Sequence, residues 1–257
     1  MSGGGRITDY DRIADQFDRR YALYEYAGTR DTLVAFLGDG PVDVLEVGCG
    51  TGHWLNGLAS RCRRTVGLEP SMPMLRVASR RLGAARRGLV RAVAERLPFA
   101  DQSFDRVFSV NALHHFSDRI QFFREARRVL RPGGGVMTIG KDPFAERDTW
   151  WVYDYFPETR AIDRARFAPV RILRGELVTS GFAWAESFEA DHIDRAQPAS
   201  EALETGVVDQ AFTSQLSALS QDEFAAGVER LRAANAAASE QLDIVADFFL
   251  YATVGWV

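Results

Sequence analysis

The sequence predicts an α/β fold, in which a mostly parallel sheet is covered by helices on both faces. Short apolar segments typical of buried strands alternate along the first half of the chain with longer segments of helical periodicity. Glycine and proline separate the two kinds of segment. The 257 residues, 46% of them hydrophobic, are enough for one sizeable core with inserted helices. We therefore expect a single domain, residues 1–257.

The order of the elements supports a parallel sheet. Apolar residues recur every three or four positions over residues 9–37, which predicts one or two N-terminal helices ended by glycine and proline. Repeated strand-helix units follow, and such units form parallel sheets with helices on both faces. The predicted strands are 42–47, 65–68, 89–93, 104–110 and 136–139, and the predicted helices between them are 52–60, 72–82 and 118–130.

The pattern changes after residue 139. Aromatic residues without a clear period fill residues 141–167, and a helix, a strand, a long helical stretch and a closing strand are expected at 170–180, 182–192, 200–238 and 248–257. Ser220, before Asp222 and Glu223, is a predicted N-cap. We divide the domain into an N-terminal helical cap (1–40), a ligand-binding core (41–140) and two lid insertions (141–169 and 193–240). The insertions follow the later strands, so we expect them over the carboxyl edge of the sheet, where ligands bind.

The composition argues against several classes of protein. The net charge of −4 and the pI of about 5.7 disfavour a nucleic-acid partner, because the summed field repels phosphates. Cys49 and Cys62 are too few for a disulfide framework or a structural zinc site, so we expect no metal and a reducing, cytoplasmic setting without a membrane span. Lys141 is the only lysine among 31 basic residues, a bias that we attribute to coding composition.

The strongest local signal is a glycine-rich turn after the first predicted strand. In the sequence VLEVGCGTG (44–52), three alternate glycines let a ligand approach backbone N–H groups at the start of a helix. Glu69, 19 residues after Gly50, is placed to accept ribose hydroxyls. The spacing G-x-G-x-G differs from the dinucleotide motif G-x-G-x-x-G, because His53 stands where its last glycine should be. A nicotinamide-dependent oxidoreductase is therefore a weak alternative, and Glu46 in the strand could face an ammonium group.

Five further segments carry a family resemblance. They are EPSMPML (69–75), AERLPF (94–99), SFDRV (103–107), NALHHF (111–116) and RVLRPGG (128–134). With the glycine turn, they resemble in sequence order the class I S-adenosylmethionine-dependent methyltransferases, in the branch of ubiquinone/menaquinone-type and small-molecule enzymes. The resemblance implies a Rossmann-like, mostly parallel seven-stranded sheet, S-adenosylmethionine as cofactor and S-adenosylhomocysteine as product.

The resemblance also implies a set of cofactor-binding residues. The turn glycines Gly48, Gly50 and Gly52, with Cys49, would approach the methionine moiety, Glu46 would face its ammonium, and Glu69 would hold the ribose. The remaining implied contacts are Pro70 and Met74 beside the adenine, Ala94 and Glu95 at its edge, Asn111 at the methionine amine, and Tyr10 closing over the cofactor. The chain departs from many relatives at Val93, where they place an acid for the adenine amino group.

Methyl transfer is an in-line displacement, so alignment and exclusion of water are the main tasks of the protein. The aromatic segment offers Trp151, Tyr153 and Tyr155 as residues that line an acceptor pocket, with ordinary packing as the alternative. His114 and His115 are candidate general bases for a hydroxyl or carbon acid, or structural residues.

The acceptor is expected to be a small molecule. No Asn/Asp-Pro-Pro-Tyr/Phe motif follows the fourth strand, which disfavours amino-group methylation of nucleobases. The sequence leaves the acceptor's identity open, as it does the choice among O-, N- and C-methylation and the presence of a homodimer. A cofactor-binding protein without catalysis, acting as partner or regulator, is the alternative from a different functional class.

Overall fold

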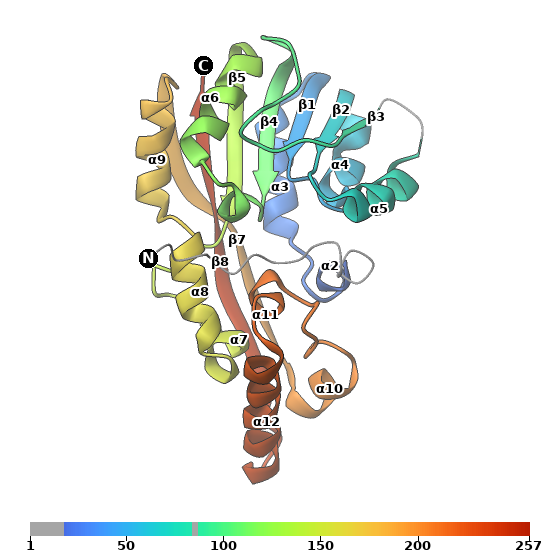
Figure 1. The fold of residues 1–257 in the computed structure, drawn as a ribbon, viewed down its shortest axis with the longest axis vertical. Helices are drawn as coiled ribbons and strands as arrows, with labels where there is room; N and C mark the ends of the chain where they lie inside the picture. Colours follow the sequence, from blue (N-terminus) through green and yellow to red (C-terminus); the bar gives the residue numbers. More distant parts are fainter. Residues whose placement is uncertain (1–17, 84–86) are drawn as a thin grey trace.

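A computed structural model describes residues 18–83 and 87–257 of the chain (Figure 1). Its centre is a sheet in the order β3-β2-β1-β4-β5-β8-β6, with β7 paired to the other edge of β8. The strands are β1 (Val42–Val47), β2 (Cys62–Leu68), β3 (Arg87–Val90), β4 (Phe104–Val110), β5 (Leu130–Gly140), β6 (Thr149–Trp150), β7 (Trp184–Pro198) and β8 (Asp243–Trp256). All pairings among β1 to β5 are parallel, and β8 runs antiparallel to its three neighbours.

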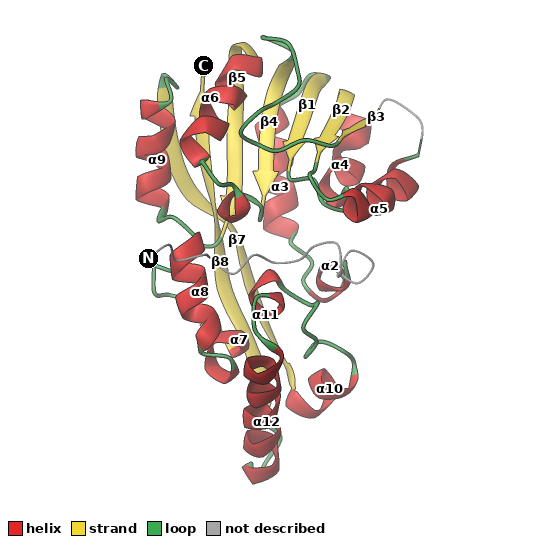
Figure 2. Ribbon diagram, viewed as in Figure 1, coloured by secondary structure: helices red, strands yellow, loops and turns green. Residues whose placement is uncertain are grey.

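Helices cover both faces of this sheet, as the alternating pattern predicts (Figure 2). One face carries α3 (Ala27–Leu37), α4 (His53–Leu58) and α5 (Met72–Leu82), whose buried side chains share a cluster with Val44 of β1. The other face carries α6 (Arg119–Val129) and α9 (Val170–Thr179), which share a second cluster with Leu45 and Val47. Successive β1 residues thus point to opposite faces, and both faces are apolar.

The second half of the chain extends the molecule beyond the parallel strands. The long antiparallel pair β7 and β8 projects past β5, and short helices pack around it (Figures 1 and 2). We call the segments 149–166 and 199–237 the helical lobe. It contains α7 (Trp151–Tyr155), α8 (Glu158–Arg166), α10 (Ala199–Glu204), α11 (Ser214–Ser217) and α12 (Gln221–Ala237).

Most predicted elements are confirmed, and several differ. The helical stretch expected at 200–238 is divided into α10, α11 and α12, with residues 205–213 outside these helices. The described sheet has eight strands where seven were expected, because residues 149–150 form the short β6 against β8. The aromatic segment after residue 141, which lacks a clear period, folds largely into α7 and α8. The N-terminal helical pattern divides into α2 (Arg19–Leu23) and α3 at Tyr26, whose φ of +48° is left-handed.

Ser220 is confirmed as the N-cap of α12. Its hydroxyl accepts from the backbone N–H of Glu223, and the Glu223 carboxylate accepts from the Ser220 N–H.

Two of the predicted acceptor-lining residues lie inside the packed lobe. Trp151 is 1% exposed and its ring packs 6.0 Å from that of Phe156. The buried Tyr153 donates a 2.7 Å hydrogen bond from its hydroxyl to the carboxylate of Asp163, which also accepts from Gln215 and Arg166. These contacts join α7, α8 and α11, so Trp151 and Tyr153 hold the lobe together.

Candidate active site

The glycine turn follows β1 and lies against the end of β2. Gly48, Gly50 and Gly52 have φ values of +74°, +51° and +72°, a region that side chains with a Cβ rarely adopt. At Gly48 a Cβ would also lie 2.5 Å from the Cβ of Ala112. The backbone N–H groups of Gly48 and Cys49 donate to the carbonyl of Leu68, at 2.8 and 3.0 Å, which fixes the turn on β2.

Glu69 is held at the end of β2 by two backbone donors. Its Oε2 accepts from the N–H of Gly50 and its Oε1 from the N–H of Ser71, both at 3.0 Å. The residue is 8% exposed, and each carboxylate oxygen can accept more than one hydrogen bond. The carboxylate is thus oriented by the glycine turn and still able to accept from a ligand.

Glu46 is a buried acid within β1. It is 1% exposed, and its Oε2 has no hydrogen-bond partner among the described residues. Burial raises the pKa of Glu46 well above its usual value, although the backbone N–H of Leu55 in α4 opposes the shift. Because an unpaired buried carboxyl oxygen is costly, this position favours a ligand that brings a donor or a positive charge.

These elements border one cavity, which we call the first cavity. The predicted cofactor residues that line it are Glu46, Gly48, Cys49, Gly50, Glu69, Pro70, Met74, Ala94, Glu95 and Asn111. Gly52 lies behind it as the N-cap position of α4, and Tyr10 lies outside the described residues.

Several residues of the first cavity were not among the predicted cofactor residues. The lining includes Arg20, Tyr21, Thr51, Trp54 and Phe116. Tyr21 belongs to the apolar pattern of the N-terminal helices, and its ring stacks on that of His53 at 3.6 Å. Helical periodicity alone could not show that this residue faces a ligand.

An ion-pair network holds the N-terminal segment against the glycine turn. The Asp18 carboxylate accepts from the Thr51 hydroxyl at 2.6 Å, and Arg81 of α5 donates to both Asp18 and Thr51. This network fixes the start of α2, and with it Arg20 and Tyr21, beside the turn.

The adenine end of the predicted site is apolar at Val93. That side chain is 50% exposed and borders the first cavity. The neighbouring Glu95 accepts through Oε1 from the backbone N–H groups of Ser117 and Asp118 and from the Ser117 hydroxyl. Glu95, which also borders the first cavity, is therefore fixed by the loop before α6.

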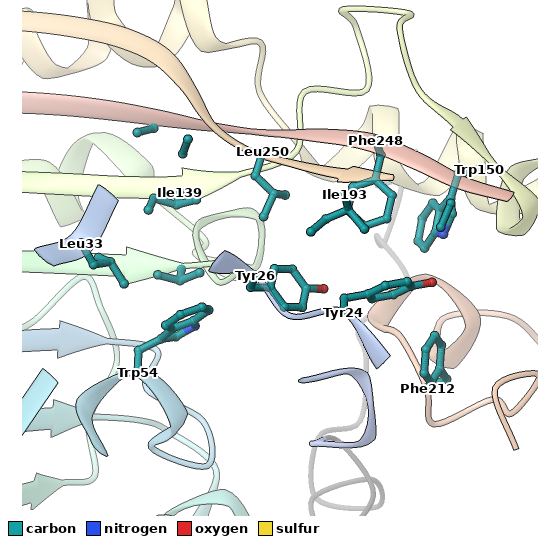
Figure 3. Packing of buried hydrophobic residues seen from close by; sticks show 14 of the residues in the cluster. Tyr24, Tyr26, Leu33, Trp54, Ile139, Trp150, Ile193, Phe212, Phe248 and Leu250 are labelled. Atoms are coloured by element: carbon teal, nitrogen blue, oxygen red, sulfur yellow. The ribbon is translucent and has the colours of Figure 1, made fainter. Parts of the chain in front are cut away.

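A second cavity lies next to the first, and Asn111 and Arg20 border both. Asn111 follows β4, has a left-handed φ of +51° and donates from its N–H to the Ile139 carbonyl at 2.8 Å. The second cavity is lined by Arg20, Tyr24, Tyr26, Asn111, His114, Lys141, Trp150, Phe167, Thr213, Ser214, Gln215, Phe248 and Leu250. Figure 3 shows how its rings Tyr24, Tyr26, Trp150 and Phe248 gather between the N-terminal segment and the helical lobe.

The predicted acceptor residues are not those that line the second cavity. Trp150 borders it, whereas Trp151, Tyr153 and Tyr155 are absent from its described lining. Trp150 is thus the member of this aromatic stretch in the described lining, and the assignment of Trp151, Tyr153 and Tyr155 to an acceptor stays a prediction.

The two candidate bases separate between the cavities. His115 lines the first, and His114 lines the second with its ring stacked 4.0 Å from Phe167. Burial, reinforced by nearby Arg166 and Arg20, lowers the pKa of His115 to about 3 and that of His114 well below its usual value. Both rings are therefore neutral at pH 7.

Comparison with known proteins identifies the family. Residues 45–138 match the model of a methyltransferase domain family. A malonyl-[acyl-carrier protein] O-methyltransferase of Marinomonas sp. (strain MWYL1) is 31% identical over 198 residues, which cover 70% of this chain and 73% of that protein. The chain belongs to the class I S-adenosylmethionine-dependent methyltransferases.

Further relatives agree with this assignment. A malonyl-[acyl-carrier protein] O-methyltransferase of Methylovorus sp. (strain MP688) is 34% identical to this chain. The matched residues cover 57% of this chain and 56% of that protein. A solved structure described as a methyltransferase of an antibiotic biosynthesis pathway in Anabaena variabilis superposes with a TM-score of 0.70 at 22% identity, covering 87% of this chain and 95% of that one. That likeness confirms the fold.

Two further expectations are that the protein has no membrane span and no metal site. In residues 18–83 and 87–257, no helix is both long and apolar enough to cross a membrane. The same residues contain no group of three or more histidine, cysteine, aspartate or glutamate side chains arranged to hold a metal ion.

Proposed function

We propose that this methyltransferase binds S-adenosylmethionine in the first cavity and transfers its methyl group to a small-molecule acceptor in the second. The observation that carries the proposal is the shared wall: Asn111 and Arg20 border both cavities at the carboxyl edge of the sheet. A donor and an acceptor bound on the two sides of this wall would lie close enough to be aligned for in-line displacement.

The residues of the first cavity fit the cofactor. The unpaired, buried Oε2 of Glu46 suits the methionine ammonium, and the Glu69 carboxylate suits the ribose hydroxyls. A Cβ built on Gly50 would meet no atom within 4 Å, so a ligand can approach that backbone closely. We assign Pro70 and Met74 to the adenine faces, Ala94 and Glu95 to its edge, and Gly48, Cys49 and Asn111 to the methionine moiety.

The bound cofactor supplies an electrophilic methyl group on a sulfonium. The protein's task is then to orient the acceptor and to exclude water. We propose that residues 141–169 and 193–240 act as the lid that does so, because the helical lobe and Trp150 border the second cavity. The neutral His114 and His115 can accept a hydrogen bond, but their low pKa values make them weak bases, so an acceptor that needs little deprotonation is favoured.

The relatives' names give two kinds of acceptor. By those names, one acts on malonyl-[acyl-carrier protein] and another on demethylmenaquinone, so a small molecule and a carrier-bound acyl group are both represented. A non-catalytic cofactor-binding partner or regulator remains the rival function, and only turnover separates it from an enzyme.

Calorimetric titration with S-adenosylhomocysteine and, in parallel, with NAD tests the proposal. We expect binding of the first and none of the second. Glu69→Ala should weaken S-adenosylhomocysteine binding by about 1–3 kcal/mol, because it leaves the ribose hydroxyls without their acceptor. Glu204→Ala, on the distant α10, is the control and should leave the affinity unchanged. Equal affinity in wild type and Glu69→Ala would remove the ribose assignment, and absence of binding to wild type would remove the proposed function.

A further inference from the structure

We propose that the first cavity leaves position 6 of the adenine ring open to solvent beside Val93, so that this methyltransferase binds cofactor analogues with other groups at that position. This inference rests on the proposed function. It adds to that function the part of the cofactor for which the protein does not select, and it names Val93 as the residue responsible.

The order of the strands gives the direction in which the cofactor lies. β2 stands between β1 and β3 in the sheet. We assign the ammonium to Glu46 of β1 and the ribose to Glu69 after β2, so the base extends in the same direction and lies over the end of β3. The segment after β3 contributes Val93, Ala94 and Glu95 to the lining of the first cavity. The six-membered ring of the base, which carries the amino group and is remote from the ribose, therefore faces this segment.

The segment after β3 is fixed beside the end of β2. Nε of Arg91 donates to the carbonyl of Pro70 at 3.0 Å, and the N–H of Glu69 donates to the carbonyl of Val90 at 3.1 Å. These two hydrogen bonds define where Val93 lies relative to Pro70, to which we assign one face of the adenine.

The first cavity reaches the surface at this end. Val93 is 50% exposed, and Pro70, which also borders the cavity, is exposed. Met74 and Ala94 are 1% and 4% exposed and form the buried part of the same wall. A valine side chain has no atom that accepts a hydrogen bond. A group attached to the base at Val93 would therefore meet solvent, and this side chain gives an amino group no advantage over another group.

Glu95 is the acid of the same segment, and its carboxylate is already engaged. Its Oε1 accepts from the Ser117 N–H at 2.6 Å, from the Ser117 hydroxyl at 2.8 Å and from the Asp118 N–H at 3.2 Å. The amino group would be a further donor to this carboxylate, which gains little from another hydrogen bond because three donors already satisfy it. The segment thus offers no side chain reserved for the amino group.

Calorimetric titrations of the full chain with related ligands test the inference. The ligands are S-adenosylhomocysteine, an analogue in which a methyl group replaces the amino group at position 6, and an analogue with a butyl group there. The methyl group has the size of the amino group but donates no hydrogen bond, and the butyl group needs space beyond the ring. We expect the dissociation constants to agree within about threefold, because no hydrogen bond is lost and the substituent reaches solvent.

Val93→Asp supplies the acceptor that valine lacks. This variant should shift the ratio of affinities toward S-adenosylhomocysteine over the methyl analogue by about fivefold, since the amino group can then donate to a partly exposed carboxylate. Val178→Asp is the matched control. Val178 lies on α9, is 58% exposed and is absent from the described lining of the first cavity, so the same added charge should leave the ratio unchanged. Glu95→Gln should also leave it unchanged.

Two results in wild type would overturn the inference. Binding of the methyl analogue about tenfold or more weakly than S-adenosylhomocysteine would show that the amino group has an acceptor, and rejection of the butyl analogue would show a closed wall. A ratio that Val93→Asp does not change would overturn the assignment to Val93, and a preference for the amino group that is lost in Glu95→Gln would assign the acceptor to Glu95. Failure of this inference alone leaves S-adenosylhomocysteine binding intact, whereas absence of that binding removes the proposed function and the inference with it.

Discussion

The first cavity is bordered by Glu46, Glu69 and Glu95 and by the backbone of the glycine turn, whereas the second is bordered by Lys141 and aromatic rings, and Arg20 borders both. A cofactor with a sulfonium and an ammonium suits the carboxylates of the first cavity. The comparison teaches that the two neighbouring cavities differ in their acidic side chains: three glutamates line the first, and the described lining of the second contains neither aspartate nor glutamate. The first cavity is shaped largely by the backbone of the glycine turn, whereas the second is shaped by side chains.

The largest expected effect tests the backbone of the first cavity. Gly48→Ala should lower the free energy of unfolding by about 2–4 kcal/mol and abolish S-adenosylhomocysteine binding, because it combines a left-handed φ with a close contact to Ala112. Denaturant unfolding and calorimetry measure the two effects. Gly40→Ala is the control, since a Cβ there meets nothing within 4 Å.

Adding Ala112→Gly to Gly48→Ala separates the two causes. The double variant should regain the part of the stability lost to the contact and keep the part lost to the backbone conformation. A Gly48→Ala protein as stable as wild type would mean that the turn does not require glycine.

A smaller effect is expected from Glu46→Gln, which tests the charge of the first cavity. The affinity for S-adenosylhomocysteine should fall by about 1–3 kcal/mol, because the amide cannot pair with an ammonium as a carboxylate does.

Glu46→Gln should also change how stability depends on pH. The raised pKa of Glu46 in the folded state means that the folded protein holds a proton that the unfolded chain releases above about pH 4.5. Stability from this group therefore declines as pH rises above that value, and the variant should lack the decline. Identical pH slopes in denaturant unfolding of the two proteins would contradict the raised pKa.

The smallest effect is expected from His115→Asn. The folded-state pKa of His115 is about 3 and the usual value is 6.5, so the unfolded chain binds the proton first and stability is lost as pH falls from 6.5 toward 3. At pH 5.5 the free energy of unfolding of the variant should be about 1 kcal/mol higher relative to wild type, because the variant lacks this loss. At pH 7 the variant should show no such gain. Unfolding at the two pH values measures this. A histidine titration near 6.5 in the pH profile of kcat/KM would show instead that His115 is charged in the free protein.

The first cavity could be predicted from the sequence because contiguous motifs build it. The turn at 44–52 and Glu69 directly follow neighbouring parallel strands, so strand order alone brings them to one edge. The parallel part of the fold was predictable for the same reason. The two residues of β6, the helices α7 and α8 and the division of 200–238 into three helices give no periodic signal that would place them.

The second cavity could not be predicted because separate segments build it. Tyr24, Lys141, Gln215 and Phe248 meet only through tertiary packing, and aromatic content does not reveal which ring faces inward. Lys141 offered one unused signal: it is the only lysine of an arginine-rich chain, and it stands directly after β5. The cytoplasmic setting and a homodimer stay predictions.

The position of β8 has a consequence for how the protein folds. This strand pairs with β5 on one side and with β7 on the other, and it supplies Phe248 and Leu250 to the second cavity. Its partners in β5 lie far away along the chain, and such pairing closes slowly because a long loop must first lose entropy. We therefore expect the strands β1 to β4 and the glycine turn to assemble early, and the second cavity to acquire its shape in the last step of folding.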